Sequence, residues 1–511
     1  MLCKKVRQVV TVESKIEKAK AIAKRNEKVS NLEIMVGELK DITFTQKFDY
    51  ITLIGSLPYV AKANGKTSQE LLSKLQELLK EDGKLLIAVD NRFGIKYFVG
   101  NPDPYLEKKF VGLLNYNNEE EKIETYTRQK LIDLLNQVGF YCKHFYYPLP
   151  DYRMPNVIFS DLELPQYNTI DKYAPYYTEK SDILIDEIDL FREILKTDNQ
   201  LFTFFANAYF VEASRQEMPF TYKYISYNNM RQPAYRLITK IGQEYVEKET
   251  VDENAIEHYE QIKQNIDILQ KLGIQTLDSV ENGKIKSKYM EQSKLLSAVL
   301  AKKLEEQQID IFYEMVDAYY EKVKQSSEKL EDKQITIFEN NAIAITAEQK
   351  ENLYFLKQGL WDMTFKNCFY LEGNYYFFDQ EWKDENLPAE YILYRSIVYT
   401  ISLRRFINIH EILEKYKLTL YLDIFKQLDE KMQEKIRDDA IWKYYSQNHF
   451  FDIDSTKQEL INETIRSKAK DDAIIGMQKQ IEALSNQLTN RKLTIRLKRK
   501  ISKWMKKSTN P

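Results

Sequence analysis

The sequence predicts an α/β protein in which a parallel sheet covered by helices comes first, an α+β domain follows, and a helical segment ends the chain. Three observations predict this class. Apolar runs alternate with helical segments over about the first 165 residues, three short strand signals precede a helix near the middle, and residues 457–490 hold one Gly and no Pro. The 511 residues are enough for several cores. We expect four parts, at residues 1–215, 216–425, 426–490 and 491–511.

Composition and charge exclude several classes of protein. Lys and Arg total 75 and Asp and Glu 77, so the net charge of -2 argues against a uniformly basic nucleic-acid binder. Three distant cysteines (Cys3, Cys142 and Cys368) and four histidines in no metal-binding spacing argue against a zinc site or a disulfide framework. No apolar run of membrane-spanning length and no signal peptide is evident. We therefore expect a cytoplasmic protein of bacterial type without a nucleic-acid partner.

The first part contains apolar runs of the kind that form buried strands, separated by helical segments. The runs cover residues 6–13, 32–37, 48–55, 84–90 and 140–147, and the helical segments cover 14–26, 68–79 and 126–138. Leu201 to Ser214 is also strand-like, and we expect it to close the first sheet as its last strand. Near-continuous apolar strands that alternate with helices favour a parallel sheet covered on both faces.

Polar residues follow the carboxyl ends of these predicted strands, where open α/β sheets bind their ligands. Glu13 ends the first run, where a carboxylate can accept both ribose hydroxyls, and Glu38 follows the second, where an acid can bind an adenine amino group. Gly55-Ser56 ends the third run and Asp90-Asn91-Arg92 the fourth. A solvated strand end would explain any one of them, but four together indicate a nucleoside pocket.

The first part resembles the class I methyltransferases that use S-adenosylmethionine, in particular a bacterial group encoded with surface-polysaccharide enzymes. The resemblance rests on VVTVESKIEKAKAIAKRN, NLEIMVGELKDI, FDYITLIGSLPYV, LLKEDGKLLIAVDNRFGIKYFVG and YYPLPDYRMPNVIFSDLELP, and it covers about residues 1–165. It implies a Rossmann-like sheet that binds S-adenosylmethionine, with Glu13 on the ribose and Glu38 on the adenine. It also implies that Asn91, Arg92 and the region of Tyr97 face the methyl acceptor.

The same resemblance implies the strand order 3-2-1-4-5-7-6, whose central first strand leads into a glycine-rich turn. The sequence shows only MLCKK before the run that ends at Glu13. We therefore expect the runs at 6–13 and 48–55 to face an empty slot with unpaired backbone groups, and the cofactor to lose its glycine cradle. A truncated start, gene decay, or a rearranged or partner-completed sheet would account for this departure. We expect methyl transfer by this exact chain to be impaired.

Strand signals at 220–227, 235–241 and 244–250 open the second part, and a helix follows them. Lys248 lies in the third strand. A lysine at that place can position nucleotide phosphates when a helix acid, here Glu257 or Glu260, pairs with it. The alternative is an exposed strand lysine.

Residues 359–382 carry the second signal of a kinase-like domain. Asp362 and Asn367 have the D-x-x-x-x-N spacing of a kinase catalytic loop, and a predicted hairpin then ends at Asp379. In this reading Asp362 accepts a hydroxyl proton, and Asn367 and Asp379 hold Mg²⁺ against the phosphates of ATP. Leu360 replaces the usual His and no glycine-rich loop joins the first two strands, so a pseudokinase that binds without chemistry is the alternative.

The sequence after residue 426 predicts surfaces that bind other molecules. A 3-4 spacing of apolar residues favours a coiled coil and a homo-oligomer, with a single amphipathic helix packed against the body as the alternative. Residues 491–507 carry nine Lys or Arg and no acid, which suits an anionic membrane surface. RNA binding and a solvated charged end are the alternatives for that tail. The apolar seam consists of Ile474, Met477, Ile481, Leu484 and Leu488.

The order of these parts resembles the bifunctional methyltransferase–kinase chain terminators of bacterial O-antigen polysaccharides. That resemblance implies a glycan or glycolipid acceptor, Mg-ATP beside S-adenosylmethionine, and a tail at residues 491–511 that docks on the inner face of the membrane. The alternative function is a catalytically inactive scaffold that recruits glycosyltransferases to the membrane.

Overall fold

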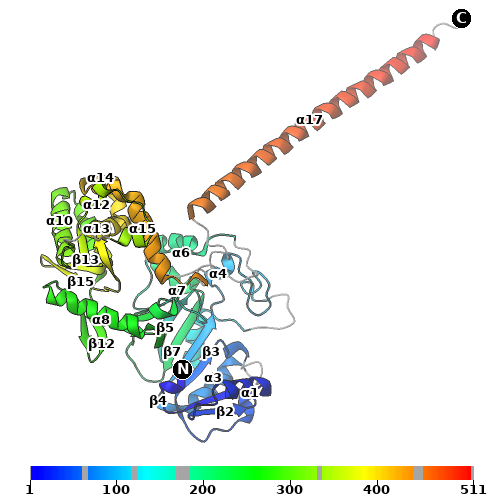
Figure 1. Cartoon of the computed structure of the whole chain (residues 1–511). Helices are drawn as coiled ribbons and strands as arrows, with labels where there is room; N and C mark the ends of the chain where they lie inside the picture. Colours follow the sequence, from blue (N-terminus) through cyan, green and yellow to red (C-terminus); the bar gives the residue numbers. More distant parts are fainter. Residues whose placement is uncertain are drawn as a thin grey trace. The chain divides into compact units, whose positions relative to one another are not determined.

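The computed structural model describes residues 2–59, 67–116, 124–167, 170, 184–251, 253–330, 336–440 and 453–507. The chain divides into two compact units, Met1–Asn448 and His449–Pro511. Strands and helices are interspersed in the first unit, so the predicted α/β class is confirmed, and the described part of the second unit is one helix (Figure 1).

Within the described residues, ten strands form one mixed sheet in the order β11-β12-β10-β9-β8-β6-β5-β7-β4-β3. The pair β3 and β4 is parallel, and the other neighbouring pairs are antiparallel. The strands are β3 (Phe48–Ile54), β4 (Leu79–Asp90), β5 (Cys142–Leu149), β6 (Val157–Ser160), β7 (Ala208–Ser214), β8 (Tyr224–Tyr227), β9 (Leu237–Ile241), β10 (Tyr245–Thr250), β11 (Asp278–Glu281) and β12 (Lys284–Lys288).

The expectation of a purely parallel first sheet was wrong. The run at 201–214 forms a strand over β7, which lies between β4 and β5, the place that the order 3-2-1-4-5-7-6 gives to the last strand, and it runs antiparallel to both. A strand buried on both faces carries the same apolar run whichever way it points, so the sequence pattern located the strands without fixing their direction.

Two strands at the start of the chain form a separate sheet. β1 (Val9–Glu13) and β2 (Leu32–Val36) pair in parallel, joined by helix α1 (Ile16–Arg25). β3 has β4 as its partner on one side, and none of the described strands pairs with its other side or with the free side of β1. Within the described residues the slot expected between the first and third runs is therefore open, and Tyr50 and Ile54 of β3 are exposed.

Helices cover the first half of the large sheet because their apolar residues recur at helical spacing. Leu71, Leu72 and Leu75 of α3 are buried, and Thr67 begins that helix with a capping box to Glu70. The helices described in this half include α3 (Ser68–Leu78), α4 (Ile95–Phe98), α5 (Arg128–Gln137), α6 (Glu187–Thr197) and α7 (Phe202–Phe205).

The first two predicted parts share the large sheet. β6 pairs with β8 at Val157 opposite Ser226 and Ile158 opposite Ile225, which joins the strands before residue 215 to those after it. The backbone N–H of Tyr227 also donates to the carbonyl of Asn156 at 2.7 Å. Backbone hydrogen bonds therefore fix the two halves relative to each other.

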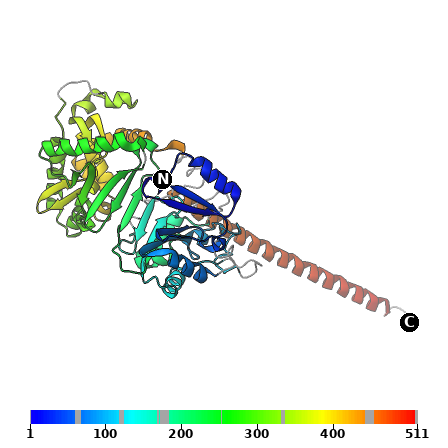
Figure 2. The same cartoon turned by 90° about the horizontal axis from the view of Figure 1, so that it is seen from below.

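The second half adds a helical lobe to its five strands. Helix α8 (Ile256–Lys271) packs on β10 and β11 (Figure 2), and the predicted hairpin forms as β14 and β15. The other elements are α9 (Leu296–Glu305), α10 (Ile309–Gln325), α11 (Ile337–Asn340), α12 (Ala347–Glu351), β13 (Phe355–Leu360), β14 (Cys368–Leu371), β15 (Asn374–Phe377), β16 (Lys383–Pro388), α13 (Ala389–Val398), α14 (Ile409–Lys415) and α15 (Leu422–Ile436). β13 and β16 form another antiparallel pair.

The second unit is helix α17 (Ile453–Lys507). Four residues of the predicted seam are exposed on it: Ile474, Met477, Ile481 and Leu484. The side chain of Leu488 and residues 508–511 of the predicted tail lie outside what the structure describes. None of the described helices is long and apolar enough to cross a bilayer.

Candidate functional site

The hairpin β14–β15 brings three of the predicted site residues together. Asp362 and Asn367 precede it and Asp379 follows it. The Asn367 side-chain amide donates to the carbonyl of Asp362 at 3.0 Å, and the N–H of Phe378 donates to the carbonyl of Asn367 at 3.0 Å. All three predicted residues are half-buried, so the hairpin presents two carboxylates and an amide at one place that solvent reaches.

Lys248 of β10 joins this group from the sheet. Its ammonium pairs with Asp379 Oδ1 and lies 2.6 Å from Glu381 Oε1. Burial opposes the charge of Lys248, but the two carboxylates raise its pKa. Lys248 therefore stays protonated, and the exposed-lysine alternative was wrong.

Glu381 is bound on both carboxylate oxygens. Oε2 pairs with the guanidinium of Arg231 and lies 3.9 Å from His258 Nε2 on α8. Burial opposes ionisation, yet the charges of Arg231 and Lys248 hold the pKa of Glu381 well below its usual range. Glu381 is thus a permanent anion in the interior of the site.

The expected pairing of Lys248 with Glu257 or Glu260 was wrong. Both glutamates are exposed on α8, and Glu260 pairs with Lys263 at 2.7 Å. The inward face of α8 instead presents Tyr259, whose hydroxyl donates to the carbonyl of Lys248 at 2.9 Å. Helical spacing permitted either glutamate to face the strand, but the apolar residues Tyr259 and Ile262 occupy the buried face.

Asp362 is a carboxyl group whose pKa is shifted strongly upward. Burial raises its pKa to about 7, the charges of Glu381 and Asp379 act in the same direction, and Arg395 and Arg231 oppose them. A carboxylate whose pKa lies close to the working pH can accept and release a proton efficiently.

Asp379 is held in an unusual conformation. Its φ is 58°, in the left-handed region that non-glycine residues rarely adopt, and its N–H donates to Asp278 Oδ2 at 2.7 Å. Ser287 donates to the other oxygen of Asp278. Strained residues of this kind gather at functional sites, where surrounding contacts fix them.

Several residues of this site had no clear sequence signal. Glu381 could have been suspected from its place two residues after Asp379, but nothing marked Arg231, Asp278 or His258. No group of three or more His, Cys, Asp or Glu side chains suited to a metal ion occurs in the described part of the chain. A cation here would use Asp379 and the amide oxygen of Asn367, with a ligand's own oxygens completing its shell.

The residues predicted to hold S-adenosylmethionine lie at the end of the β1–β2 pair. Glu13 ends β1, and its carbonyl accepts the N–H of Gly37, which places Glu38 at the same edge. Glu13 Oε1 accepts the N–H of Lys15 at 3.0 Å. Both glutamates are half-buried, so a ligand can reach them, but none of the described strands closes the opposite side of this edge.

The predicted acceptor-facing residue Asn91 is part of the core. It is fully buried, its amide donates to the carbonyls of Phe204 and Ala206, and its oxygen accepts the N–H of Phe93. A buried amide must satisfy its hydrogen bonds, and Asn91 does so by joining β4 to the segment before β7, so its predicted role was wrong. Tyr97 is also buried, and Arg92 donates to the carbonyl of Leu113 at 3.0 Å.

Asp90 at the end of β4 is the centre of an unpredicted ion cluster. Lys96 lies 2.6 Å and Arg153 3.1 Å from its carboxylate, and Arg153 also pairs with Asp151 at 2.6 Å. Burial opposes its charge, but Lys96 and Arg153 lower the pKa of Asp90. A cavity of about 330 Å³ lies beside this cluster, at the join of β6 and β8, and is lined by Arg153, Met154, Pro155, Tyr227, Asn229 and Arg236.

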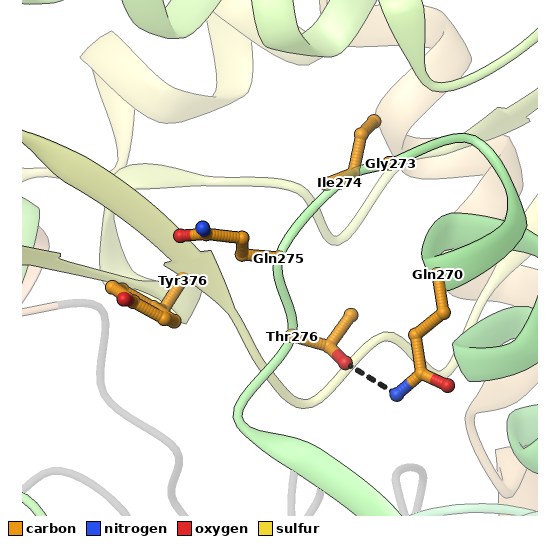
Figure 3. Close-up of a pocket in the computed structure, with 6 residues that line it drawn as sticks. All are labelled: Gln270, Gly273, Ile274, Gln275, Thr276 and Tyr376. Carbon is orange, nitrogen blue, oxygen red and sulfur yellow. Dashed lines mark hydrogen bonds between the residues drawn. The ribbon is translucent and has the colours of Figure 1, made fainter.

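A second cavity of about 330 Å³ lies at the turn between α8 and β11 (Figure 3). It is lined by Gln270, Gly273, Ile274, Gln275, Thr276 and Tyr376, and Gln270 donates to the Thr276 hydroxyl at 3.0 Å. Its lining carries no acid, base or cation, so it lacks the groups that acid–base or phosphoryl chemistry requires.

No protein-family model matches the chain, and no curated protein does. Among solved structures, a methyltransferase dependent on S-adenosylmethionine from Thermotoga maritima, described as a possible histamine N-methyltransferase, is 12% identical with a TM-score of 0.24, and the match covers 40% of this chain and 72% of that one. Another such methyltransferase, from Clostridium acetobutylicum, is 12% identical with a TM-score of 0.24 over 42% of this chain and 78% of that one. The plantazolicin methyltransferase, solved with SAH, is 13% identical with a TM-score of 0.24 over 42% and 71%. At these TM-scores the matches carry no argument about activity.

Proposed function

We propose that the second half of the chain is a kinase-like domain that binds Mg-ATP and transfers its terminal phosphoryl group to a hydroxyl of a bacterial surface glycan. The observation that carries this proposal is the ion pair between Lys248 of β10 and Asp379 beyond the β14–β15 hairpin. It brings the ammonium of Lys248 to the carboxylate of Asp379, and Asp362 is close enough to Asp379 for their charges to interact, which supports phosphate and Mg²⁺ binding at this place.

Each side chain then has a distinct role. Lys248 binds phosphate oxygens, and Asp379 with Asn367 holds the cation that neutralises the charge on the phosphates. Asp362, whose pKa burial raises to about 7, accepts the proton of the attacking hydroxyl. Arg231 and Arg395 keep enough positive charge nearby for Asp362 to ionise.

The first half is proposed to be a methyltransferase-like domain that binds S-adenosylmethionine through Glu13 and Glu38 and methylates the glycan. None of the strands in the described ranges pairs with the free sides of β1 and β3, which favours a second candidate, in which this half is inactive and the chain is a scaffold for glycosyltransferases. Titration with S-adenosylhomocysteine distinguishes them, because a catalytic half binds it and loses binding on Glu13→Ala, whereas an inactive half does not bind.

Binding of Mg-ATP tests the kinase-like domain. Calorimetric titration of the full chain should give a binding constant for Mg-ATP that Lys248→Ala abolishes. Glu372→Ala, at the exposed tip of the β14–β15 hairpin, should leave it unchanged. Absence of binding by the unaltered chain at millimolar ATP would refute the proposal and leave the scaffold.

The tail at residues 491–511 is proposed to bind the anionic inner surface of the membrane, and the seam of α17 to pair with further copies of the chain. Arg491 and Arg496 are exposed in the tail, as are Ile495 and Leu497, which combines cationic and apolar groups on one helix. Sedimentation with vesicles containing anionic lipid should depend on the tail and weaken with salt. Binding that survives removal of 491–511, or RNA binding in its place, would contradict this role.

A further inference from the structure

The two carboxylates that bind Lys248 differ in how firmly they are held. The side chain of Glu381 is 4% exposed and that of Asp379 is 39% exposed. Glu381 contacts Lys248 through one oxygen and Arg231 through the other. The Asp379 carboxylate is partly exposed to solvent, so it can rotate away from Lys248. If the Glu381 carboxylate moved away, a buried charge would remain without a partner.

Side-chain amides fix the backbone that carries Glu381. Asn265 of α8 is fully buried and donates to the carbonyl of Gln380 at 3.0 Å. The Gln380 amide donates in turn to the carbonyl of Asp362 at 3.1 Å. Helix α8 therefore contacts Lys248 through the Tyr259 hydroxyl and supports it through the backbone around Glu381, but it supplies no carboxylate to the ammonium.

The four side chains that these ion pairs join have balanced charges before any ligand enters. Lys248 and Arg231 carry two positive charges, and Asp379 and Glu381 carry two negative charges. A nucleotide alone would bring an uncompensated polyanion to a lysine that already pairs with two carboxylates. A divalent cation that draws Asp379 away frees donors of Lys248, because an ammonium has three N–H groups and Glu381 needs only one or two of them.

We propose that Glu381 is the positioning residue that anchors Lys248, and that Asp379 blocks Lys248 until a divalent cation takes over its carboxylate. This inference rests on the proposed nucleotide site and adds its regulation. Cation and nucleotide then bind as a coupled pair, and the anchor of the lysine lies on the same segment as the cation-binding acid, not on α8.

Equilibrium binding of ATP, measured in EDTA and in Mg²⁺, tests the blocking role. The unaltered chain should bind at least ten-fold more weakly in EDTA. Asp379→Asn should bind ATP in EDTA at least ten-fold more tightly than the unaltered chain does, and should gain less than two-fold from Mg²⁺. An Asp379→Asn variant that binds no more tightly in EDTA would overturn the proposal.

The anchoring role has its own variants. Glu381→Gln should weaken ATP binding in Mg²⁺ at least ten-fold, and Glu381→Asp, which keeps the charge, should restore part of that loss. Glu257→Gln and Glu260→Gln are matched controls on α8 and should stay within two-fold. A loss in either control, with Glu381→Gln unaffected, would assign the anchor to the helix and contradict the inference.

A readout without nucleotide separates failure of this inference from failure of the proposed function. The rate at which a small acylating reagent modifies Lys248 can be followed by peptide mass spectrometry. Millimolar Mg²⁺ alone should raise this rate several-fold in the unaltered chain and leave it unchanged in Asp379→Asn. No response to Mg²⁺ would refute the blocking contact whether or not ATP binds, and this comparison remains decisive if Glu381→Gln fails to fold.

Discussion

Replacing Asp362 by Asn should remove a pH dependence of stability that the buried carboxyl group imposes on the second half of the chain. Burial raises the pKa of Asp362 from 3.8 to about 7 in the folded protein. Between these values the folded chain keeps a proton that the unfolded chain releases, so the free energy of unfolding falls as pH rises through this window. The amide of the Asp362→Asn variant has no proton to release, so that variant should show no such fall.

The size of this change in the free energy of unfolding follows from the shift in the pKa of Asp362. The change of about 3 pKa units is worth at most roughly 4 kcal/mol over the whole window. Between pH 5.5 and 7.5 the same two pKa values give a change of roughly 2 kcal/mol, or about 30-fold in an opening equilibrium. The unaltered protein and the Asp362→Asn variant should therefore differ in how steeply the free energy of unfolding changes with pH, and not only in its value at one pH.

Hydrogen exchange of the amides in β14 and β15 measures this slope locally. Local measurement is needed because a chain of this size does not unfold in one step. At each pH the exchange rates of Asp362→Asn and the unaltered chain are compared, which removes the intrinsic effect of pH. Equal ratios at pH 5.5 and 7.5 would refute the raised pKa, and with it the assignment of Asp362 as a base that works near neutrality.

Three further outcomes are expected from the packing. Arg395→Met should destabilise α13 and α15 by about 3–5 kcal/mol, because it leaves the buried carboxylate of Asp429 without its cation, and hydrogen exchange of these helices should report the loss. Lys357→Met, at an exposed pair, should leave that exchange unchanged, and equal exchange in the two variants would contradict this. Backbone amides of β1 and β2 should exchange with solvent earlier than those of β7. Each strand of the β1–β2 sheet has one neighbour, whereas β7 has a neighbour on each side; the reverse order would mean that the slot between β1 and β3 is filled in solution. Ile481→Asp should lower the sedimenting mass of the full chain, whereas Ile475→Asp, off the seam, should not; identical masses would exclude the coiled coil.

The sequence located half of the candidate site. The spacing of Asp362, Asn367 and Asp379 sufficed because all three flank one hairpin, and a hairpin necessarily brings its two ends together. Lys248 was found because strand residues before a helix are recognisable locally. Arg231 and Asp278 were missed because they lie more than 100 residues away in sequence from their partners Glu381 and Asp379. A local sequence pattern gives no information about contacts between residues so far apart in the chain.

Helix α8 shows why partners are harder to predict than elements. Its boundaries follow from composition, but the choice of which face is buried depends on what the strands present to it. Burying Tyr259 and Ile262 lowers the free energy of the fold, whereas burying Glu257 or Glu260 would remove a charge from water. The glutamates of α8 therefore face solvent, and Lys248 pairs with Glu381 instead.

The sequence by itself determined the α/β class, the positions of the buried strands, the hairpin and the long C-terminal helix, because each depends on residues close together in the chain. Only the tertiary structure decided that the strands before and after residue 215 form one sheet, that β7 runs antiparallel to β4 and β5, and that Asn91 belongs to the core. These outcomes depend on which surfaces meet after folding, and backbone hydrogen bonds between strands carry no sequence signature of their own.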